Sequence, residues 1–190
     1  MILSPEESLN HLKAGNERYA SGEPGHVRVT PQLLEELYKN GQSPYAVIIG
    51  CSDSRVPIEV IFDAGPGEFF VIRTAGNVVC PIEMGSLEYA VMHTKASLIV
   101  VLGHRYCGAV AAAVKDEQYS PATGAIIREI RACAPDVIGN DPELIEDLNI
   151  KYVISKVTEN PYVAKAAAQG LLKIIGAKYS LQTGRVTFFD

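Results

Sequence analysis

The sequence lacks the features that mark membrane proteins and nucleic-acid-binding proteins. No apolar run approaches the roughly 18 residues that a membrane-spanning helix needs. No run of five basic residues occurs, and the formal net charge of −5 argues against nucleic acid as the main partner. The first ten residues are too polar for a secretory signal. We therefore expect a soluble, cytoplasmic protein with no membrane partner and no nucleic-acid partner.

Cysteine is also scarce, and this scarcity excludes a fold held together by disulfide bonds. The chain has four cysteines, which are too few and too widely spaced for a disulfide framework, and a reducing compartment would keep them as thiols. An isolated free cysteine is usually a small buried hydrophobe, which is our interpretation of Cys80 and Cys133. Cys51 differs because it precedes Asp53 and Arg55 closely, and charged neighbours suggest metal binding or catalysis.

Signals for nucleotide binding and for several domains are missing too. No G-x-G-x-x-G motif or P-loop follows the first predicted strand, which argues against a nucleotide-binding domain. No internal repeat, low-complexity segment or long linker divides the chain. A length of 190 residues and a hydrophobic content of 47% fit a single globular domain with a sizeable core.

Continuous apolar runs predict the central sheet. The runs at 45–50, 68–73 and 97–103 are typical of strands covered on both faces. Residues 81–94, between the second and third runs, have helical spacing, and a strand-helix-strand unit favours parallel pairing. We predict an α/β fold: a single domain with a mainly parallel central β-sheet of about four to five strands flanked by helices.

The rest of the chain predicts further helices and a closing hairpin. Residues 1–41 are interpreted as an N-terminal helical arm, and residues 42–190 as the α/β core. The hairpin or edge strand is predicted within 177–189, around Thr183-Gly184. The helices are predicted at 4–20, 31–40, 108–115, 124–133, 142–157 and 160–175.

Candidate metal ligands follow two of the predicted strands. Cys51 follows the first strand, and His104 and Cys107 follow the third. The carboxyl ends of parallel strands meet at one edge of a sheet, so these three side chains are expected at one point. Two sulfurs and one nitrogen make a good zinc site with an open fourth position, whereas structural zinc sites usually have four protein ligands. His11, His26 and His93 have no such setting, and we expect them on the surface or hydrogen-bonded.

Three segments of the chain then show a family resemblance. Residues 51–77 (CSDSRVPIEVIFDAGPGEFFVIRTAGN), 85–91 (GSLEYAV) and 100–110 (VVLGHRYCGAV) resemble the β-class carbonic anhydrases. The resemblance runs through most of 42–115 in the same order. It implies one Zn²⁺ per chain on Cys51, His104 and Cys107. It also implies an enzyme that hydrates carbon dioxide reversibly to bicarbonate and a proton, by attack of zinc-bound hydroxide, in a homodimer or homotetramer.

The same resemblance assigns Asp53 and Arg55 to a catalytic dyad beside the metal. The planar guanidinium of Arg55 can engage both carboxylate oxygens of Asp53. Held in this way, Asp53 would accept a hydrogen bond from the nucleophile and aim its lone pair at carbon dioxide. If the pair broke, Asp53 could become the fourth ligand. The alternative interpretation is an ordinary ion pair that caps the start of a helix.

The resemblance also suggests a substrate pocket. Gln42, Phe70 and Tyr89 match the bicarbonate pocket of the plant-like branch of the family, and the chain lacks the tryptophan of the other branch's inhibitory site. Without the family, Gln42 is a loop residue, Phe70 a core residue and Tyr89 a packed helix residue. Gly108 is predicted at the substrate site, where it allows close backbone approach, and the same role is predicted nearby for Gly76 and Gly103.

Two alternative functions remain open at this point. The same zinc site could hydrolyse carbonyl sulfide or carbon disulfide, which motifs barely distinguish from carbon dioxide hydration. The chain could instead be a non-catalytic zinc-binding module, which predicts that no coordination position is open to water.

Overall fold

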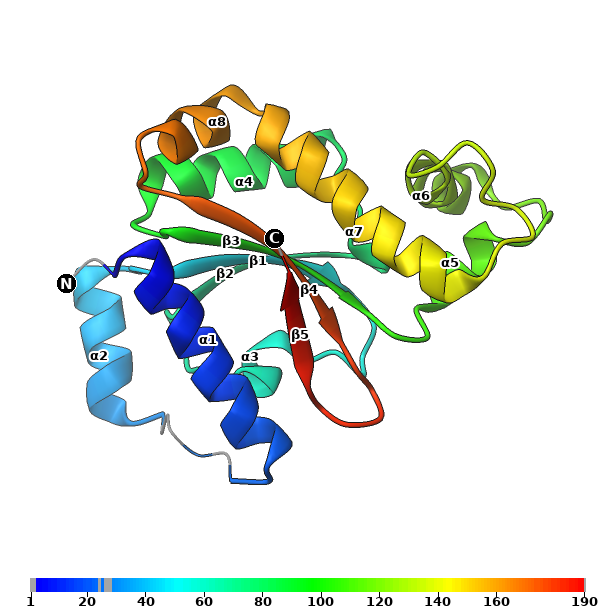
Figure 1. Ribbon diagram of the computed structural model, residues 1–190. Coiled ribbons are helices and arrows are strands. Elements are labelled where there is room, and N and C mark those ends of the chain that lie inside the picture. Colours follow the sequence, from blue (N-terminus) through cyan, green and yellow to red (C-terminus); the bar gives the residue numbers. More distant parts are fainter. Residues whose placement is uncertain (1–2, 24, 26–28, 190) are drawn as a thin grey trace.

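The computed structural model, which describes residues 3–23, 25 and 29–189, contains a five-stranded sheet (Figure 1). The strand order is β2-β1-β3-β4-β5. The first four strands are parallel, and β5 runs antiparallel to β4. This arrangement confirms the predicted α/β fold. The strands are β1 (Ala46–Cys51), β2 (Phe69–Thr74), β3 (Leu98–His104), β4 (Lys173–Tyr179) and β5 (Val186–Phe189).

The apolar runs form the inner strands because both faces of those strands are covered. Every residue of β1 and of β3 is buried. The predicted spans 45–50, 68–73 and 97–103 each lie one residue before the observed strand. That shift of one residue places Cys51 and His104 as the last residues of β1 and β3.

Helices cover both faces of the sheet (Figure 1). Helices α1 (Pro5–Ala20) and α3 (Ile58–Ile61) pack on one face. Helices α4 (Pro81–His93), α7 (Pro142–Glu159) and α8 (Pro161–Ala168) pack on the other. Beyond the carboxyl ends of the strands, α5 (Gly108–Ala113) and α6 (Pro121–Arg131) enclose a third apolar cluster, which includes Cys51 and Cys107.

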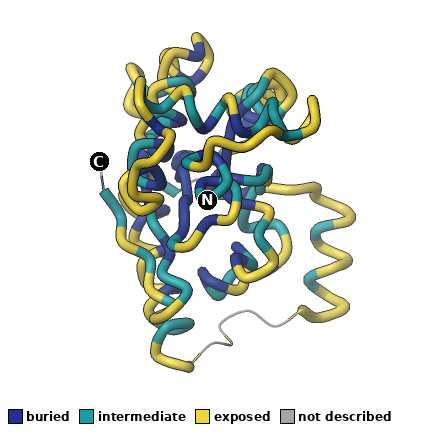
Figure 2. The backbone as a smooth tube through the Cα atoms, turned by 90° about the vertical axis from the view of Figure 1, so that its right-hand side faces the viewer, coloured by how far each residue is buried: buried dark blue, intermediate teal, exposed yellow. Residues whose placement is uncertain are grey.

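The two N-terminal helices differ in how they contact the core. Helix α1 begins with a capping box between Ser4 and Glu7, and its buried Leu9 and Leu12 pack against the sheet. It is therefore part of the core and not an arm. Helix α2 (Pro31–Asn40) has the predicted bounds but buries no residue, and Tyr38 is 88% exposed (Figure 2). Of the two helices, only α2 fits the prediction of an N-terminal arm.

The C-terminal third required the largest corrections. The helix predicted at 160–175 is wrong beyond Ala168, because residues 173–175 belong to β4. Gly170 has a φ of +69° and donates its N–H to the carbonyl of Ala167, which ends the helix. The hairpin around Thr183-Gly184 is confirmed. The helix predicted at 108–115 ends two residues earlier, at Ala113, and the helix predicted at 124–133 spans Pro121–Arg131. The helix predicted at 142–157 continues to Glu159, and the short helix α3 was not predicted.

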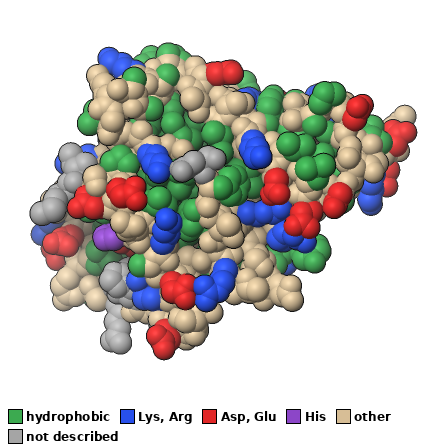
Figure 3. All heavy atoms as spheres, viewed as in Figure 1, with side chains coloured by type: hydrophobic (Ala, Val, Ile, Leu, Met, Phe, Trp, Pro, Cys, Tyr) green, Lys and Arg blue, Asp and Glu red, His purple; other side chains and the backbone are tan. Residues whose placement is uncertain are grey.

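Two further features of the structure concern helix length and surface charge. Within the described part of the chain, no helix is long and apolar enough to cross a membrane. Acidic and basic side chains are interspersed over the face drawn in Figure 3, so neither sign of charge dominates it.

Candidate metal centre

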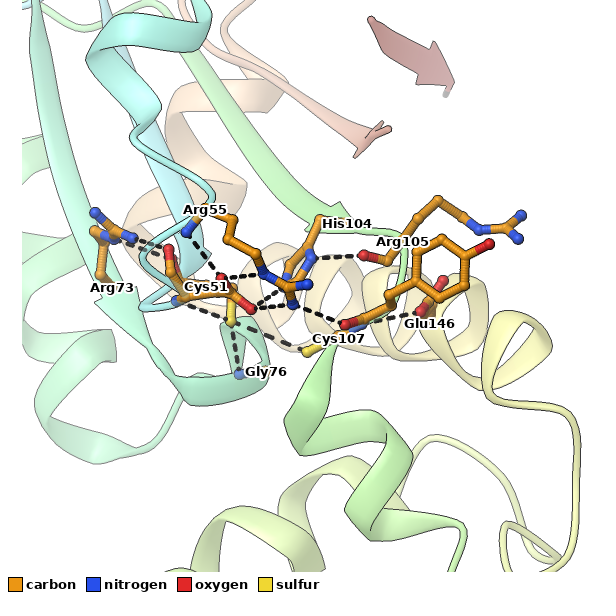
Figure 4. A network of polar contacts seen from close by, with 10 residues as sticks. Cys51, Arg55, Arg73, Gly76, His104, Arg105, Cys107 and Glu146 are labelled. Atoms are coloured by element: carbon orange, nitrogen blue, oxygen red, sulfur yellow. Dashed lines mark hydrogen bonds and ion pairs between the residues drawn. The ribbon is translucent and has the colours of Figure 1, made fainter. Parts of the chain in front are cut away.

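Cys51, His104 and Cys107 come together at the carboxyl edge of the sheet (Figure 4). Cys51 ends β1 and His104 ends the neighbouring parallel strand β3, while Cys107 is the N-cap residue of α5. One ligand atom from each residue lies within 4.8 Å of the other two. All three side chains are buried, at 4%, 1% and 2% exposure. The structure thus gathers the three residues that the sequence singled out as ligands.

The donor atoms suit a cation with tetrahedral coordination. His104 Nδ1 lies 2.9 Å from the carbonyl oxygen of Arg105, which fixes the ring so that Nδ1 donates and Nε2 keeps its lone pair. His104 Nε2 is buried and has no hydrogen-bond partner. The Sγ atoms of Cys51 and Cys107 are 4.0 Å apart. Two sulfurs bound to one tetrahedral zinc lie about 3.8 Å apart, so the residues fit that ion.

Hydrogen bonds directed at one sulfur favour a thiolate. The pKa of Cys51 is lowered to about 4, chiefly by the hydrogen bond from the Cys107 thiol and further by the backbone N–H groups of Asp53 and Gly76. Those two N–H groups lie 3.4 and 3.3 Å from the sulfur. The pKa of Cys107 is raised, because its thiol serves as the donor to Cys51 and is buried. A cation at this point would favour the thiolate form of both residues.

Asp53 and Arg55 form the predicted bidentate pair. Arg55 Nε donates to Asp53 Oδ1 at 3.0 Å, and Nη2 donates to Oδ2 at 2.7 Å. The hydrogen bond from Arg55 is the main reason that the pKa of Asp53 lies well below its usual range. The helix-cap interpretation fails, because α3 begins after Pro57 and no side chain caps it.

The dyad faces the candidate ligands and bridges their loops. Asp53 Oδ2 is 3.9 Å from His104 Nε2, so the carboxylate lies next to the ligand atoms. Arg55 Nη2 also donates to the carbonyl of Tyr106 at 3.1 Å. Tyr106 has a φ of +57°, an unfavourable conformation for a bulky residue that this contact helps to hold.

Arg73 is a contributor that the sequence analysis missed. It is the fifth residue of β2, and its Nε donates to the carbonyl of Cys51 at 2.9 Å. Its Nη2 donates to the carbonyl of Asp53, also at 2.9 Å. One side chain thus holds the backbone on both sides of the turn that follows β1. The feature that could have indicated Arg73 from the sequence is a charged residue near the end of a mostly apolar strand.

The glycines near the site have three different roles. Gly76 has a φ of +70° and donates its N–H to Cys51 Sγ, so this turn needs a residue without a Cβ. A Cβ on Gly103 would lie 2.5 Å from a side-chain carbon of Ile150, so β3 and α7 approach closely there. A Cβ on Gly108 would meet nothing within 4 Å, so space is open beside Cys107.

Gln42, Phe70 and Tyr89 are not brought to this edge within one chain. Gln42 is an exposed loop residue that precedes β1, whereas Cys51 ends that strand. Phe70 is four residues before Thr74, which pairs with Cys51, so it lies about 13 Å back along β2. Tyr89 is 52% exposed, and its ring centroid is 6.2 Å from that of Phe70.

The other cysteines and histidines have ordinary surroundings. Cys80 and Cys133 are half-buried and pack against the third apolar cluster, as expected for small hydrophobic side chains. The ring of His11 contacts Tyr45, and the ring of His93 contacts Tyr89. His26 lies outside the described residues.

Comparisons with known proteins agree with this geometry. A family model described as carbonic anhydrase matches residues 46–186. Carbonic anhydrase 2 of Mycobacterium tuberculosis is 38% identical over 195 aligned residues, covering 98% of this chain and 94% of that protein. A carbonic anhydrase of Mycolicibacterium smegmatis is 37% identical over 96% of this chain and 92% of its own length.

Solved structures agree as well. A structure from a study of two tetrameric β-carbonic anhydrases of Sordaria macrospora aligns with a TM-score of 0.77 and 29% identity. The alignment covers 96% of this chain and 93% of that one. A Coccomyxa β-carbonic anhydrase in complex with acetazolamide aligns with a TM-score of 0.71 and 29% identity, over 96% and 81% of the two chains. The sequence, the fold and the Cys-His-Cys site together show that this chain belongs to the β-carbonic anhydrase family of enzymes.

Proposed function

We propose that the protein catalyses the reversible hydration of carbon dioxide to bicarbonate and a proton, with one Zn²⁺ bound by Cys51, His104 and Cys107. The observation that carries this proposal is the meeting of three buried ligand atoms within 4.8 Å, beside an ionised carboxylate. Three protein ligands are the number typical of catalytic zinc sites. Family membership supports the choice of carbon dioxide as the substrate.

The three ligand residues would hold the metal through two sulfurs and His104 Nε2. Their burial excludes competing water from the ligand atoms, and the Arg105 carbonyl keeps the imidazole in the tautomer that can bind. When bound, zinc supplies a Lewis acid that lowers the pKa of a coordinated water to about 7, a value established for carbonic anhydrases with three histidine ligands.

Asp53 would orient the attacking water. Its carboxylate is ionised and can only accept hydrogen bonds, and Arg55 occupies both of its oxygens from one side. The remaining lone pairs are available to accept a hydrogen bond from a water next to His104 Nε2. That nitrogen lies 3.9 Å from Asp53 Oδ2. A water held through its hydrogen turns an oxygen lone pair toward the carbon of carbon dioxide. This geometry is set before the reaction begins.

We also propose that a second copy of the chain completes the substrate pocket. Gln42, Phe70 and Tyr89 lie away from the ligand edge of their own chain, so a pocket built from them needs a neighbouring subunit. Exposed apolar side chains around β2 and α4, including Ile82 at 82% exposure and Tyr89, fit such a contact. The tetrameric relatives from Sordaria macrospora support a homodimer or homotetramer.

The test of this function is stopped-flow hydration of carbon dioxide, with zinc content and carbonyl sulfide hydrolysis measured on the same sample. The proposal predicts about one zinc per chain and much faster turnover of carbon dioxide than of carbonyl sulfide. Zinc without turnover of either substrate would favour a non-catalytic module. Preferred turnover of carbonyl sulfide would leave the site correct and the substrate wrong.

A further inference from the structure

Helix α7 directs two buried polar side chains, Glu146 and Asn149, toward the metal centre (Figure 4 labels Glu146). Glu146 is 4% exposed and Asn149 is 1% exposed. They share a helical face with the buried Ile150 and Val153, where apolar residues are expected. Burying a carboxylate or an amide is unfavourable unless it is paired, so the partners of these two side chains indicate their role.

Glu146 contacts the backbone of a candidate ligand. Its Oε1 accepts the N–H of Cys107 at 3.2 Å. Its Oε2 lies 3.0 Å from Nζ of Lys178, and that Nζ is also 2.7 Å from Asp147 Oδ1. Lys178 therefore compensates the buried charge, while the other carboxylate oxygen fixes the position of the Cys107 peptide.

Asn149 binds the backbone of Gly76, the residue that donates a hydrogen bond to the other thiol, that of Cys51. Asn149 Nδ2 donates to the carbonyl of Gly76 at 2.8 Å, and the N–H of Gly76 donates to Cys51 Sγ at 3.3 Å. Gly76 lies in a short turn and has a left-handed backbone conformation. Holding its carbonyl fixes the orientation of the residue whose N–H points at the sulfur.

We propose that Glu146 and Asn149 are positioning residues of the metal centre, which fix the backbone on which the two metal-binding thiols depend. The proposal rests on the proposed zinc site. One helix, with polar residues three positions apart, would set where both sulfurs lie. Residues that orient metal ligands in this way typically change metal affinity by about 10- to 100-fold when they are replaced.

A purely structural role makes a different prediction. Replacing a buried ion pair with apolar residues of similar volume is often neutral or stabilising for a fold. If Glu146 and Lys178 served only the fold, the double variant Glu146→Leu/Lys178→Met would keep both its stability and its metal. If Glu146 positions Cys107, the same variant keeps its stability and loses metal faster.

The experiment measures zinc release from the full-length protein into an excess of a chromophoric chelator, with a urea unfolding curve for each variant. Both Glu146→Leu/Lys178→Met and Asn149→Leu are expected to release zinc about 10- to 100-fold faster than the unmodified chain. Glu146→Gln keeps an acceptor for the Cys107 N–H, so its release rate should stay close to that of the unmodified chain. With cobalt in place of zinc, the two apolar variants should show a shifted thiolate-to-metal charge-transfer band.

The matched control is Asn16→Leu. Asn16 is also buried and also donates to backbone carbonyls, those of Ile61 and Gly184, neither of which is bonded to a candidate ligand. This variant should lose stability in urea and release zinc at the unmodified rate. Unchanged release and unchanged cobalt spectra in Asn149→Leu and in the double variant would overturn the proposal. If the unmodified chain takes up no zinc, the proposed function fails first, and that result is distinct from a failure confined to the variants.

Discussion

Replacing Asp53 with alanine tests the assigned chemistry at a single side chain. The variant removes the carboxylate 3.9 Å from His104 Nε2 but none of the three candidate ligands, so zinc content should stay unchanged. If Asp53 orients the attacking water, kcat and kcat/KM should fall together, because the lost contact is made mainly in the transition state. The expected loss is about 10²- to 10³-fold, the range for one preorganised polar group at a reacting centre.

Arg55→Ala should differ from Asp53→Ala in magnitude and in pH dependence. It removes side-chain contacts to Asp53 at 3.0 and 2.7 Å and to the Tyr106 carbonyl at 3.1 Å. The backbone N–H of residue 55 still donates to Asp53 Oδ1, at 2.9 Å in the native chain. The loss at neutral pH should therefore be smaller. The released carboxylate could turn toward the metal, and hydroxide competes better with it as pH rises. Activity should thus recover partly in alkali, a recovery that Asp53→Ala cannot show by this route.

The assay is stopped-flow carbon dioxide hydration across a range of pH, with zinc content measured for each sample. Arg185→Ala is the matched control, because Arg185 makes a similar bidentate pair with Glu17, at 2.8 and 3.1 Å, on the exposed surface. Exposed pairs contribute little to stability, and the side-chain hydrogen bonds of Arg185 go to Glu17, not to the candidate ligands or the dyad. If Asp53→Ala and Arg55→Ala keep their zinc and turn over as fast as Arg185→Ala at neutral pH, the dyad is structural and the reasoning is wrong.

Four further predictions follow from other features of the molecule. Cys51→Ser should lose most of its zinc, whereas Cys80→Ser and Cys133→Ser should retain it; full zinc occupancy in the first variant would refute the ligand assignment. In the metal-free protein, the pKa of Cys51 is about 4 against an ordinary 9.0, so between those pH values the unfolded chain binds more protons than the folded one. The free energy of unfolding should therefore rise with pH in this window and fall as pH drops toward 4. Urea titrations at several pH values should show that Cys51→Ser depends less steeply on pH than the unmodified chain, and an equal dependence would contradict this. Gly15→Ala should lower the free energy of unfolding by about 3 kcal/mol, since its Cβ would lie 1.9 Å from the carbonyl oxygen of Phe62; calorimetry showing no loss would contradict the packing. Light scattering during the assay should detect at least a dimer, and an active monomer would rule out a shared substrate pocket.

Much of the fold and the site could be predicted because they depend on local patterns. Long apolar runs made β1 and β3 recognisable, and a parallel sheet brings their carboxyl ends together by necessity. Cys51, His104 and Cys107 could therefore be grouped without any contact information. The C-terminal error was avoidable in part, since Gly170 after an alanine-rich helix is a typical stop signal.

The residues that support the site could not be predicted in the same way. Arg73, Glu146 and Asn149 act through backbone groups on other elements, and no spacing in the sequence records which carbonyl or N–H they meet. Their only signal was a charged or polar residue in a buried apolar pattern. Gln42 precedes β1 and Phe70 lies near the start of β2, so strand direction places both away from the carboxyl edge, and a motif match alone does not consider strand direction.

The most direct test of the central claim is a zinc titration of the metal-free protein, followed by the initial rate of carbon dioxide hydration. If Cys51, His104 and Cys107 hold the one catalytic metal, the rate should rise in proportion to added zinc and stop rising at one equivalent per chain. Activity in the metal-free protein, or a rate that does not rise with the first equivalent of zinc, would contradict the account.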